Sequence, residues 1–294
     1  MVAPAPKSRP TPPAARRNSP PSQPPAPTAR AVVSFGKIEP CNGHRTLLYG
    51  PGGAGKTTLA ATAPGPVAFF DFDGSLPVLG HQLGELPIMT VNCPPTWQGM
   101  RDALHGTGWE QVRTIVIDTA TAAEDLAIAW TLENVPHPEY DTKVDRIEGY
   151  GYGKGYQFVY ETFLMLLGDL DQHVRAGRHV ILVCHDCVNT VPNPAGEDWI
   201  RWEPRLQSPP SGKAATRLRI REWADHVLFV GYDVAVKTDP KNKRAKGKGV
   251  GVGTRTIWPQ ELPHCMAKSR SLADPLELVK FDTTIWDLLF GTAE

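Results

Sequence analysis

The sequence lacks any apolar stretch of about 18 residues, the length that a membrane-spanning helix needs. It has only five cysteines, an odd number that does not favour a disulfide framework. Its first 30 residues contain no acidic side chain and no apolar run of about seven or more, so they do not resemble a secretory signal. We therefore expect a cytoplasmic protein without membrane contacts.

Proline is concentrated at the amino terminus, where ten of the 29 prolines lie within the first 27 residues. Such a stretch cannot bury enough apolar surface to offset the loss of chain entropy on folding. We predict that residues 1–32 form a disordered Pro/Ala-rich tail and that residues 33–294 form the folded domain. The tail's basic residues are Lys7, Arg9, Arg16, Arg17 and Arg30.

The formal net charge of zero conceals an uneven distribution. Without the five positive charges of the tail, 26 basic residues face 31 acidic ones, a net charge of −5. The folded part is therefore not a uniformly basic nucleic-acid binder, and any such surface must be local.

The most informative segment is LLYGPGGAGKTTL, from Leu47 to Leu59. An apolar strand over 44–49 leads into a glycine-rich loop, and the loop leads into a helix, the context in which G-x-x-x-x-G-K-T binds phosphates. The alternative, an ordinary glycine-rich turn, does not explain both flanks. We predict an ATP site formed by Gly50, Pro51, Gly52, Gly53, Ala54, Gly55, Lys56, Thr57 and Thr58. Lys56 would contact the β- and γ-phosphates, and the Thr57 hydroxyl would bind Mg²⁺.

Further apolar runs alternate with helical segments, as in an α/β domain with a mostly parallel sheet flanked by helices. Strands are expected over 67–75, 87–91, 112–118, 179–186 and 226–236, with 254–258 pairing back. Helices are expected over 97–105, 120–133, 158–177 and 213–223, and the remaining segments, including 134–156 and 187–212, are interpreted as loops.

Asp118 ends the apolar strand that follows the glycine-rich loop by about sixty residues. A carboxylate at this position can hold Mg²⁺ opposite Thr57. The next residue is Thr119 rather than Glu, so that another group must orient the attacking water.

The order of P-loop, FFDFD, IVIDT and VILVCH resembles a RecA-type ATPase core. More closely, residues 33 to about 280 resemble phage-encoded RecA-like, AAA-type P-loop proteins, a group that includes single-strand-annealing recombinases. The segments that carry this resemblance are SFGKIEP, GYGKGYQFVYETFLMLL, NPAGEDW, REWADHVLF and AKSR.

This resemblance implies catalytic roles for Lys56, Asp118 and four further residues. Asp73 would be the catalytic carboxylate, although many relatives have Glu there, and His185 would be a polar sensor of the γ-phosphate. Lys268 and Arg270 would reach across a homo-oligomer interface to the neighbour's nucleotide. From the residues alone, Asp73 could instead cap a turn, His185 could be a core histidine, and the two cations could be solvated surface charges.

The resemblance also implies single-stranded DNA as a partner, with a phage single-strand-binding protein as a second one. The DNA would contact the loops over 134–156 and 187–212, and a third candidate is the lysine-rich segment 237–248. The second loop interleaves aromatics with arginines, which suits base stacking and phosphate contact, or else its tryptophans cover a small local core. The residues concerned are Trp199, Arg201, Trp202 and Arg205.

Two other functional classes remain open at this point. A small-molecule P-loop kinase would need an acceptor pocket and an arginine-rich lid, and a non-catalytic, nucleotide-switched DNA-binding module would need neither. Cys184 and Cys187 form a C-x-x-C, but His264 and Cys265 are adjacent, which is poor spacing for a zinc site.

Overall fold

The computed structural model describes residues 34–37, 42–210, 213–237 and 248–291. The chain divides into two units, Met1–Glu39 and Pro40–Glu294. Of the first unit only residues 34–37 are described, and they have no regular secondary structure. The tail predicted over residues 1–32 lies outside the described residues. The rest of this description concerns the second unit.

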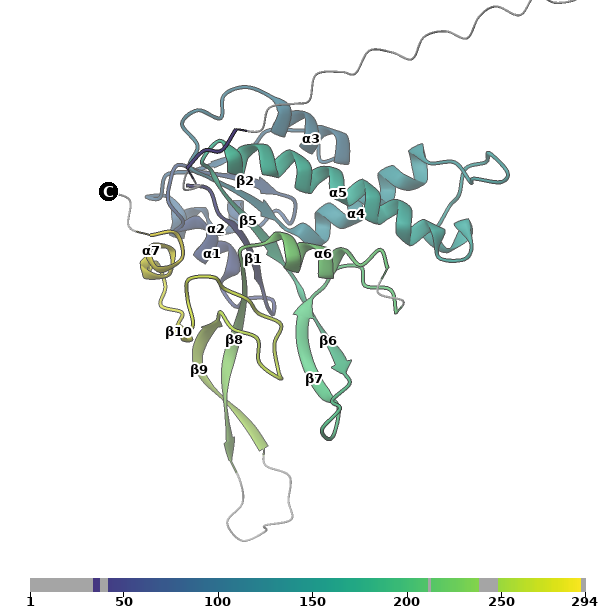
Figure 1. The fold of residues 1–294 in the computed structure, drawn as a ribbon. Coiled ribbons are helices and arrows are strands. Elements are labelled where there is room, and N and C mark those ends of the chain that lie inside the picture. Colours follow the sequence, from purple (N-terminus) through teal and green to yellow (C-terminus); the bar gives the residue numbers. More distant parts are fainter. Residues whose placement is uncertain (1–33, 38–41, 211–212, 238–247, 292–294) are drawn as a thin grey trace, which may run out of the picture. The chain divides into compact units, whose positions relative to one another are not determined.

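A sheet of eight described strands forms the centre of this unit, in the order β10–β9–β8–β1–β5–β4–β2–β3 (Figure 1). The strands from β8 to β3 in this order run parallel, while β9 pairs antiparallel with β8 and β10 antiparallel with β9. They are β1 (Arg45–Tyr49), β2 (Val67–Asp71), β3 (Ile88–Thr90), β4 (Thr114–Asp118), β5 (His179–Cys184), β8 (His226–Lys237), β9 (Lys248–Trp258) and β10 (Leu276–Glu277).

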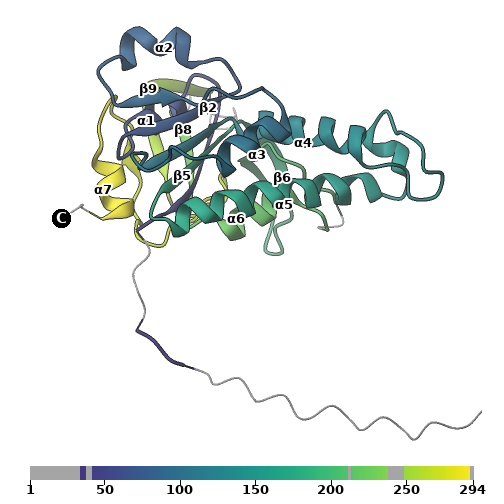
Figure 2. The same ribbon diagram turned by 90° about the horizontal axis from the view of Figure 1, so that it is seen from above.

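Helices cover both faces of the sheet, which explains why its inner strands are apolar without alternation (Figure 2). One face packs against α3 (Trp97–His105), α4 (Ala120–Asn134), α5 (Lys154–Arg175) and α6 (Thr216–Trp223). The other face packs against α1 (Lys56–Ala61), α2 (Leu76–Leu83) and α7 (Thr284–Phe290). In β1, Leu47 and Tyr49 point to the first face and Leu48 to the second. The mostly parallel α/β fold predicted from the sequence is thereby confirmed.

Two segments that the sequence suggested to be loops contain regular structure. Residues 187–212 are not one loop, because β6 (Asp186–Val191) and β7 (Trp199–Pro204) form an antiparallel hairpin. Within 134–156, a 3₁₀ turn η1 (Ile147–Tyr150) packs with Val159 in a small separate core. The helix α2 was not expected either. Its first turn contains a proline, and its surface is mostly exposed, so that it shows little apolar periodicity.

No helix in the described part of the chain is long and apolar enough to cross a membrane.

Candidate active site

The carboxyl ends of the central parallel strands meet at one edge of the sheet, and the P-loop lies at this edge. It connects the end of β1 to the start of α1. Gly50 has a φ of +151°, and a Cβ there would lie 2.1 Å from the Val230 carbonyl oxygen, so that only glycine fits against β8. Lys56 is buried, and its Nζ donates to the carbonyl oxygens of Gly50 and Pro51 at 2.7 and 2.9 Å. The loop thus holds its lysine at the place where a phosphate chain would be bound.

A cavity of about 640 Å³ opens beside the P-loop. Gly53 and the start of α1 form one wall, Asp73 and Ser75 a second, and a third is formed by Arg255 with residues 278–281. Arg255 is tied to the loop, because its Nη1 donates to the Ala54 carbonyl oxygen at 3.1 Å. This volume lies within the range of about 300–1,000 Å³ that is typical of small-molecule sites.

Thr57 and Asp118 lie together, as predicted for a Mg²⁺ site. The Thr57 hydroxyl donates to Asp118 Oδ2 at 2.7 Å, and the Ser75 hydroxyl lies 3.4 Å from the same oxygen. The pKa of Asp118 is raised to about 6, chiefly by burial. The carboxylates of Asp73 and Asp71 contribute to this rise, and the hydrogen bonds from Thr57 and Ser75 oppose it. A hydroxyl and a carboxylate are suitable Mg²⁺ ligands, and a divalent cation would compensate the negative charge concentrated here.

Asp73 is held by residues from two neighbouring strand ends. Its Oδ2 lies 3.0 Å from His185 Nε2, and its Oδ1 accepts a hydrogen bond from the Thr119 hydroxyl at 3.2 Å. Thr119 also caps α4, because its oxygen accepts from the Ala122 N–H at 3.1 Å. Asp73, which follows β2, is thus oriented by one residue that follows β4 and one that follows β5. The structure brings Asp73 and His185 together with Asp118 at the P-loop edge.

Sequence reasoning assigned no role to two polar residues at this edge, Asp71 and Thr119. Asp71 accepts hydrogen bonds from the backbone N–H groups of Ser75 and Leu76 and so holds the first turn of α2. The N-cap role of Thr119 could have been predicted from the sequence, because a threonine between a strand and a helix is a typical N-cap. The hydrogen bond between Thr119 and Asp73 joins residues that are 46 positions apart, so no local sequence pattern predicts it.

Lys268 and Arg270 lie away from this site in their own chain. Lys268 pairs with Val227, the second residue of β8. Arg270 pairs with Asp225, whose N–H donates to the carbonyl oxygen of Arg45 at the start of β1, so these cations lie toward the amino-terminal ends of the strands. Lys268 Nζ donates to the carbonyl oxygens of Arg221, Glu222 and Ala224 at the end of α6. Arg270 is largely exposed, with Nε 3.3 Å from Asp225 Oδ1. Within one chain these cations do not reach the P-loop.

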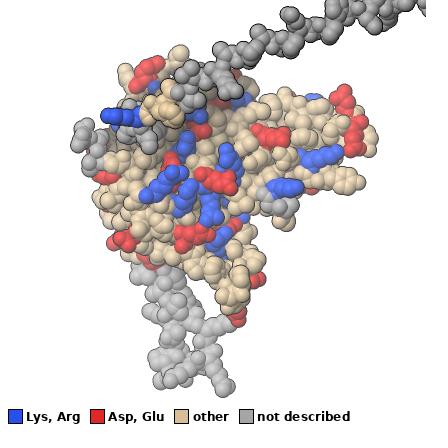
Figure 3. Space-filling model, viewed as in Figure 1, with Lys and Arg blue, Asp and Glu red and all other residues tan. Residues whose placement is uncertain are grey.

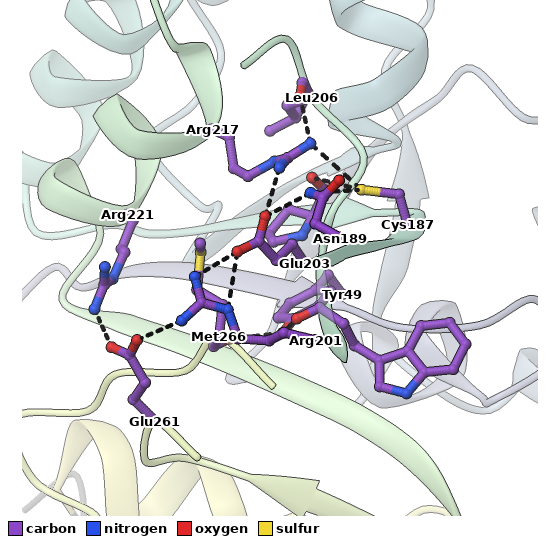
Figure 4. Close-up of polar contacts among 12 residues, drawn as sticks. Tyr49, Cys187, Asn189, Arg201, Glu203, Leu206, Arg217, Arg221, Glu261 and Met266 are labelled. Atoms are coloured by element: carbon purple, nitrogen blue, oxygen red, sulfur yellow. Dashed lines mark hydrogen bonds and ion pairs between the residues drawn. The ribbon is translucent and has the colours of Figure 1, made fainter. Parts of the chain in front are cut away.

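The β6–β7 hairpin is anchored through its buried Glu203 (Figure 4). Glu203 accepts hydrogen bonds from Asn189 Nδ2 at 2.6 Å, Arg201 Nε at 2.9 Å and Arg217 Nη1 at 2.5 Å. Arg201 also donates to Glu261 Oε1 at 2.8 Å. The guanidinium of Arg201 therefore pairs with carboxylates of its own chain, whereas Arg205 is exposed.

The other candidate nucleic-acid segments are only partly placed. Lys143 and Arg146 are exposed between α4 and α5, and Lys154 pairs with Glu139 at 3.1 Å. Of the lysine-rich segment 237–248, residues 238–247 lie outside the described part of the chain. On the face shown in Figure 3, basic and acidic side chains are interspersed.

A larger cavity of about 990 Å³ lies at the opposite edge of the sheet and contains none of the predicted site residues. It is lined by His44 and His179, which precede or begin parallel strands, and by Phe290 of α7.

Cys184 is buried at the end of β5, where burial raises the pKa of its thiol to about 12. The described residues contain no group of three or more His, Cys, Asp or Glu side chains that could hold a metal.

The P-loop, the adjacent Thr57 and Asp118, and the cavity beside them define a nucleotide-binding protein of the P-loop class. The sequence matches the AAA domain family over residues 42–271, and the chain belongs to this family. Together with the sheet order, this match supports the predicted RecA-like P-loop NTPase fold.

Two solved structures resemble the chain at low sequence identity. A KaiC-like protein from the hyperthermophilic archaeon Pyrococcus horikoshii OT3 shares 11% identity with a TM-score of 0.41, covering 80% of this chain and 84% of that one. The RadB recombinase shares 16% identity with a TM-score of 0.34, covering 73% of this chain and 79% of that one. No curated protein matches the sequence.

Proposed function

We propose that this protein hydrolyses ATP with Mg²⁺ and acts on single-stranded DNA in phage recombination or replication. One observation carries the enzymatic part: Lys56, Thr57 and Asp118 lie at the same sheet edge as a carboxylate, Asp73, whose two oxygens are held by Thr119 and His185. A phosphate-binding loop alone needs no second oriented carboxylate. Hydrolysis needs a polar side chain that positions a water in line with the γ-phosphate, and an oriented carboxylate suits that task.

Each residue then has a distinct role. Lys56 would exchange its two carbonyl partners for the β- and γ-phosphate oxygens. Thr57 and Asp118 would hold Mg²⁺, which would supply positive charge to the phosphates. Asp73 orients the attacking water and accepts its proton, and His185 keeps the carboxylate in place.

The arrangement of β5 and the hairpin supports the DNA part of the proposal. His185 contacts Asp73, and the next residue, Asp186, begins β6. A change at the γ-phosphate can therefore pass to the β6–β7 hairpin through one peptide unit. Involvement in phage strand annealing, with a phage single-strand-binding protein as partner, rests on the sequence resemblance.

A homo-oligomer would complete the site. Lys268 and Arg270 lie at the sheet side opposite the P-loop, so they can approach a nucleotide only in a neighbouring copy. Arg270 is the better candidate, because its side chain is 68% exposed whereas Lys268 donates to three carbonyl oxygens of its own chain.

Steady-state phosphate release and ATP binding, measured on Lys56→Ala and Asp73→Asn, test the enzymatic part. We expect Lys56→Ala to lose nucleotide binding. Asp73→Asn should keep it and lower kcat by about 100-fold or more, the range for loss of a positioned base. The matched control is Asp274→Asn, an exposed aspartate outside the site. Full turnover by Asp73→Asn would contradict the role proposed for Asp73. Phosphate transfer only to a small molecule would contradict ATP hydrolysis and favour a kinase.

A further inference from the structure

A second cavity, of about 600 Å³, lies between the hairpin and the outer part of the sheet. Its walls come from elements far apart in the sequence: β7, β8, β9, the segment after β9, and the P-loop. They include the rings of Trp202, Phe229, Tyr232 and Trp258 and the polar groups of Asp233 and His264. We call this cavity the aromatic pocket. None of the roles assigned above uses it.

The rings of the pocket are arranged so that planar surfaces remain accessible. Phe229 is buried and packs on Tyr49, with ring centroids 5.2 Å apart, and Trp202 lies nearly parallel to Phe229 at 6.3 Å. Trp202 and Tyr232 are 39% and 48% exposed. Two large aromatics left accessible around a hollow suit a flat, aromatic ligand, because stacking gains more from planar partners than from aliphatic ones.

The polar groups of the pocket favour a ligand with hydrogen-bonding edges. Asp233 is fixed at the rim, because its Oδ1 accepts from the Thr256 hydroxyl at 2.8 Å and its Oδ2 from the Thr254 hydroxyl at 2.5 Å. His264 stands edge-on to Trp258, with ring centroids 5.1 Å apart. A fixed carboxylate and an imidazole can pair with the N–H and carbonyl groups of a heterocycle, which an aliphatic chain lacks.

We propose that the aromatic pocket binds an unstacked base of single-stranded DNA. This rests on the proposed function and specifies its DNA site. The base would stack on Trp202 and Tyr232, while its sugar–phosphate chain remains outside. The pocket is formed in part by β8 and β9, whose register continues beyond it to the pair Lys237 and Lys248.

The pocket also adjoins the nucleotide site. Pro51 of the P-loop lines it, and the Tyr232 hydroxyl lies 3.4 Å from the position that a Cβ on Gly53 would occupy. A second contact joins the hairpin to the P-loop. The Tyr49 hydroxyl donates to the Trp202 carbonyl oxygen at 3.0 Å, and Tyr49 directly precedes Gly50. A base in the pocket would therefore touch both the hairpin and the loop that binds phosphate.

The hairpin offers a matched pair of variants for the test. Trp199 and Trp202 belong to the same strand and are 40% and 39% exposed, but they lie an odd number of positions apart, so they point to opposite faces. The measurement is fluorescence anisotropy of a labelled oligo(dT) of about 16 nucleotides, a long site for single-strand-binding folds, with the full chain at one fixed salt concentration.

We expect Trp202→Ala to raise the Kd by about 5- to 100-fold, the loss typical of one stacked base, and Trp199→Ala to change it less than about twofold. Trp202→Phe should restore most of the affinity, which a folding defect would not explain. Tyr232→Ala, on the neighbouring strand, should also weaken binding. An oligonucleotide of abasic sites should bind wild type and Trp202→Ala equally.

Three results would overturn the inference. If oligo(dT) binds but Trp202→Ala has no effect, or no more effect than Trp199→Ala, the base does not enter the pocket and the proposed DNA role stands without it. If Trp202→Ala instead changes the oligomeric state in size-exclusion chromatography and leaves DNA affinity unchanged, the pocket is a protein interface. If wild type binds no single-stranded DNA, the proposed DNA role fails together with the inference.

Discussion

Asp118 and Glu124, two buried carboxylates near the start of α4, differ in which groups can compensate their negative charge. Burial raises the pKa of Asp118 to about 6 and that of Glu124 to about 7. Asp118 accepts a hydrogen bond from Thr57, which lines the cavity beside the P-loop, where a cation can be bound. Glu124 instead accepts the Gln207 N–H at 2.9 and 3.0 Å and so joins α4 to the segment that follows the hairpin. Its role is structural, and its charge state depends on pH.

Glu124→Gln should make the stability of the protein less dependent on pH. Between about pH 4.5 and 7 the folded wild type keeps the Glu124 proton while the unfolded chain loses it, so its free energy of unfolding falls as the pH rises. Across this window we expect wild type to lose about 2–3 kcal/mol relative to the variant. Urea denaturation at pH 5 and pH 8 measures this difference, and parallel pH profiles would contradict it.

The sequence predicted the residues of the site that depend on local pattern. The P-loop and Asp118 could be identified because a strand, a loop and a helix follow one another, and because an acid ends an apolar strand. The contacts that orient Asp73 could not be predicted, since they depend on which strands are neighbours in the sheet. The intrachain partners of Lys268 were missed for the same reason.

The β6–β7 hairpin is the element that the sequence misassigned, and its stabilisation explains why. Its exposed strands alternate little between apolar and polar residues, because a buried ion-pair network rather than an apolar face anchors it. Burial alone would raise the pKa of Glu203, but hydrogen bonds from Arg201 and Asn189 and the nearby arginine charges outweigh burial and lower it.

Glu203→Ala should destabilise the protein by about 3–5 kcal/mol, because it leaves the buried Arg217 and the partly buried Arg201 without their shared carboxylate. The free energy of unfolding from urea denaturation measures this loss. Hydrogen exchange should show the hairpin amides as the most affected. Glu197→Ala, an exposed glutamate between the same two strands, serves as the control and should stay within about 0.5 kcal/mol. A loss below about 1 kcal/mol for Glu203→Ala would show that the network does not anchor the hairpin.

At the scale of the whole molecule, the predicted catalytic residues form two groups at opposite ends of the parallel strands. Lys56, Asp73, Asp118 and His185 lie at the carboxyl ends, and Lys268 and Arg270 lie toward the amino-terminal ends. This separation is expected if copies stack with the Arg270 side of one against the P-loop of the next. The sequence alone could not show it, since the order of residues along the chain does not reveal which sheet edge each one occupies.

ATP turnover per protomer should therefore rise with protein concentration. We expect Arg270→Ala to remove most of this rise without weakening ATP binding, whereas Arg219→Ala, another exposed arginine near the same surface, should retain it. Measuring the initial rate across a dilution series, with size-exclusion chromatography at the same concentrations, checks both points. A rate per protomer that is already maximal at high dilution would exclude a residue supplied by a neighbouring copy.

The central claim is that one sheet edge joins ATP hydrolysis to DNA binding through Asp73, His185 and the hairpin. The most direct test is the ATP hydrolysis rate of the full chain with Mg²⁺, measured with and without single-stranded DNA. We predict that the DNA raises the rate in wild type and not in His185→Ala, in which the link between Asp73 and the hairpin is cut. A rate that single-stranded DNA leaves unchanged in wild type would contradict the account.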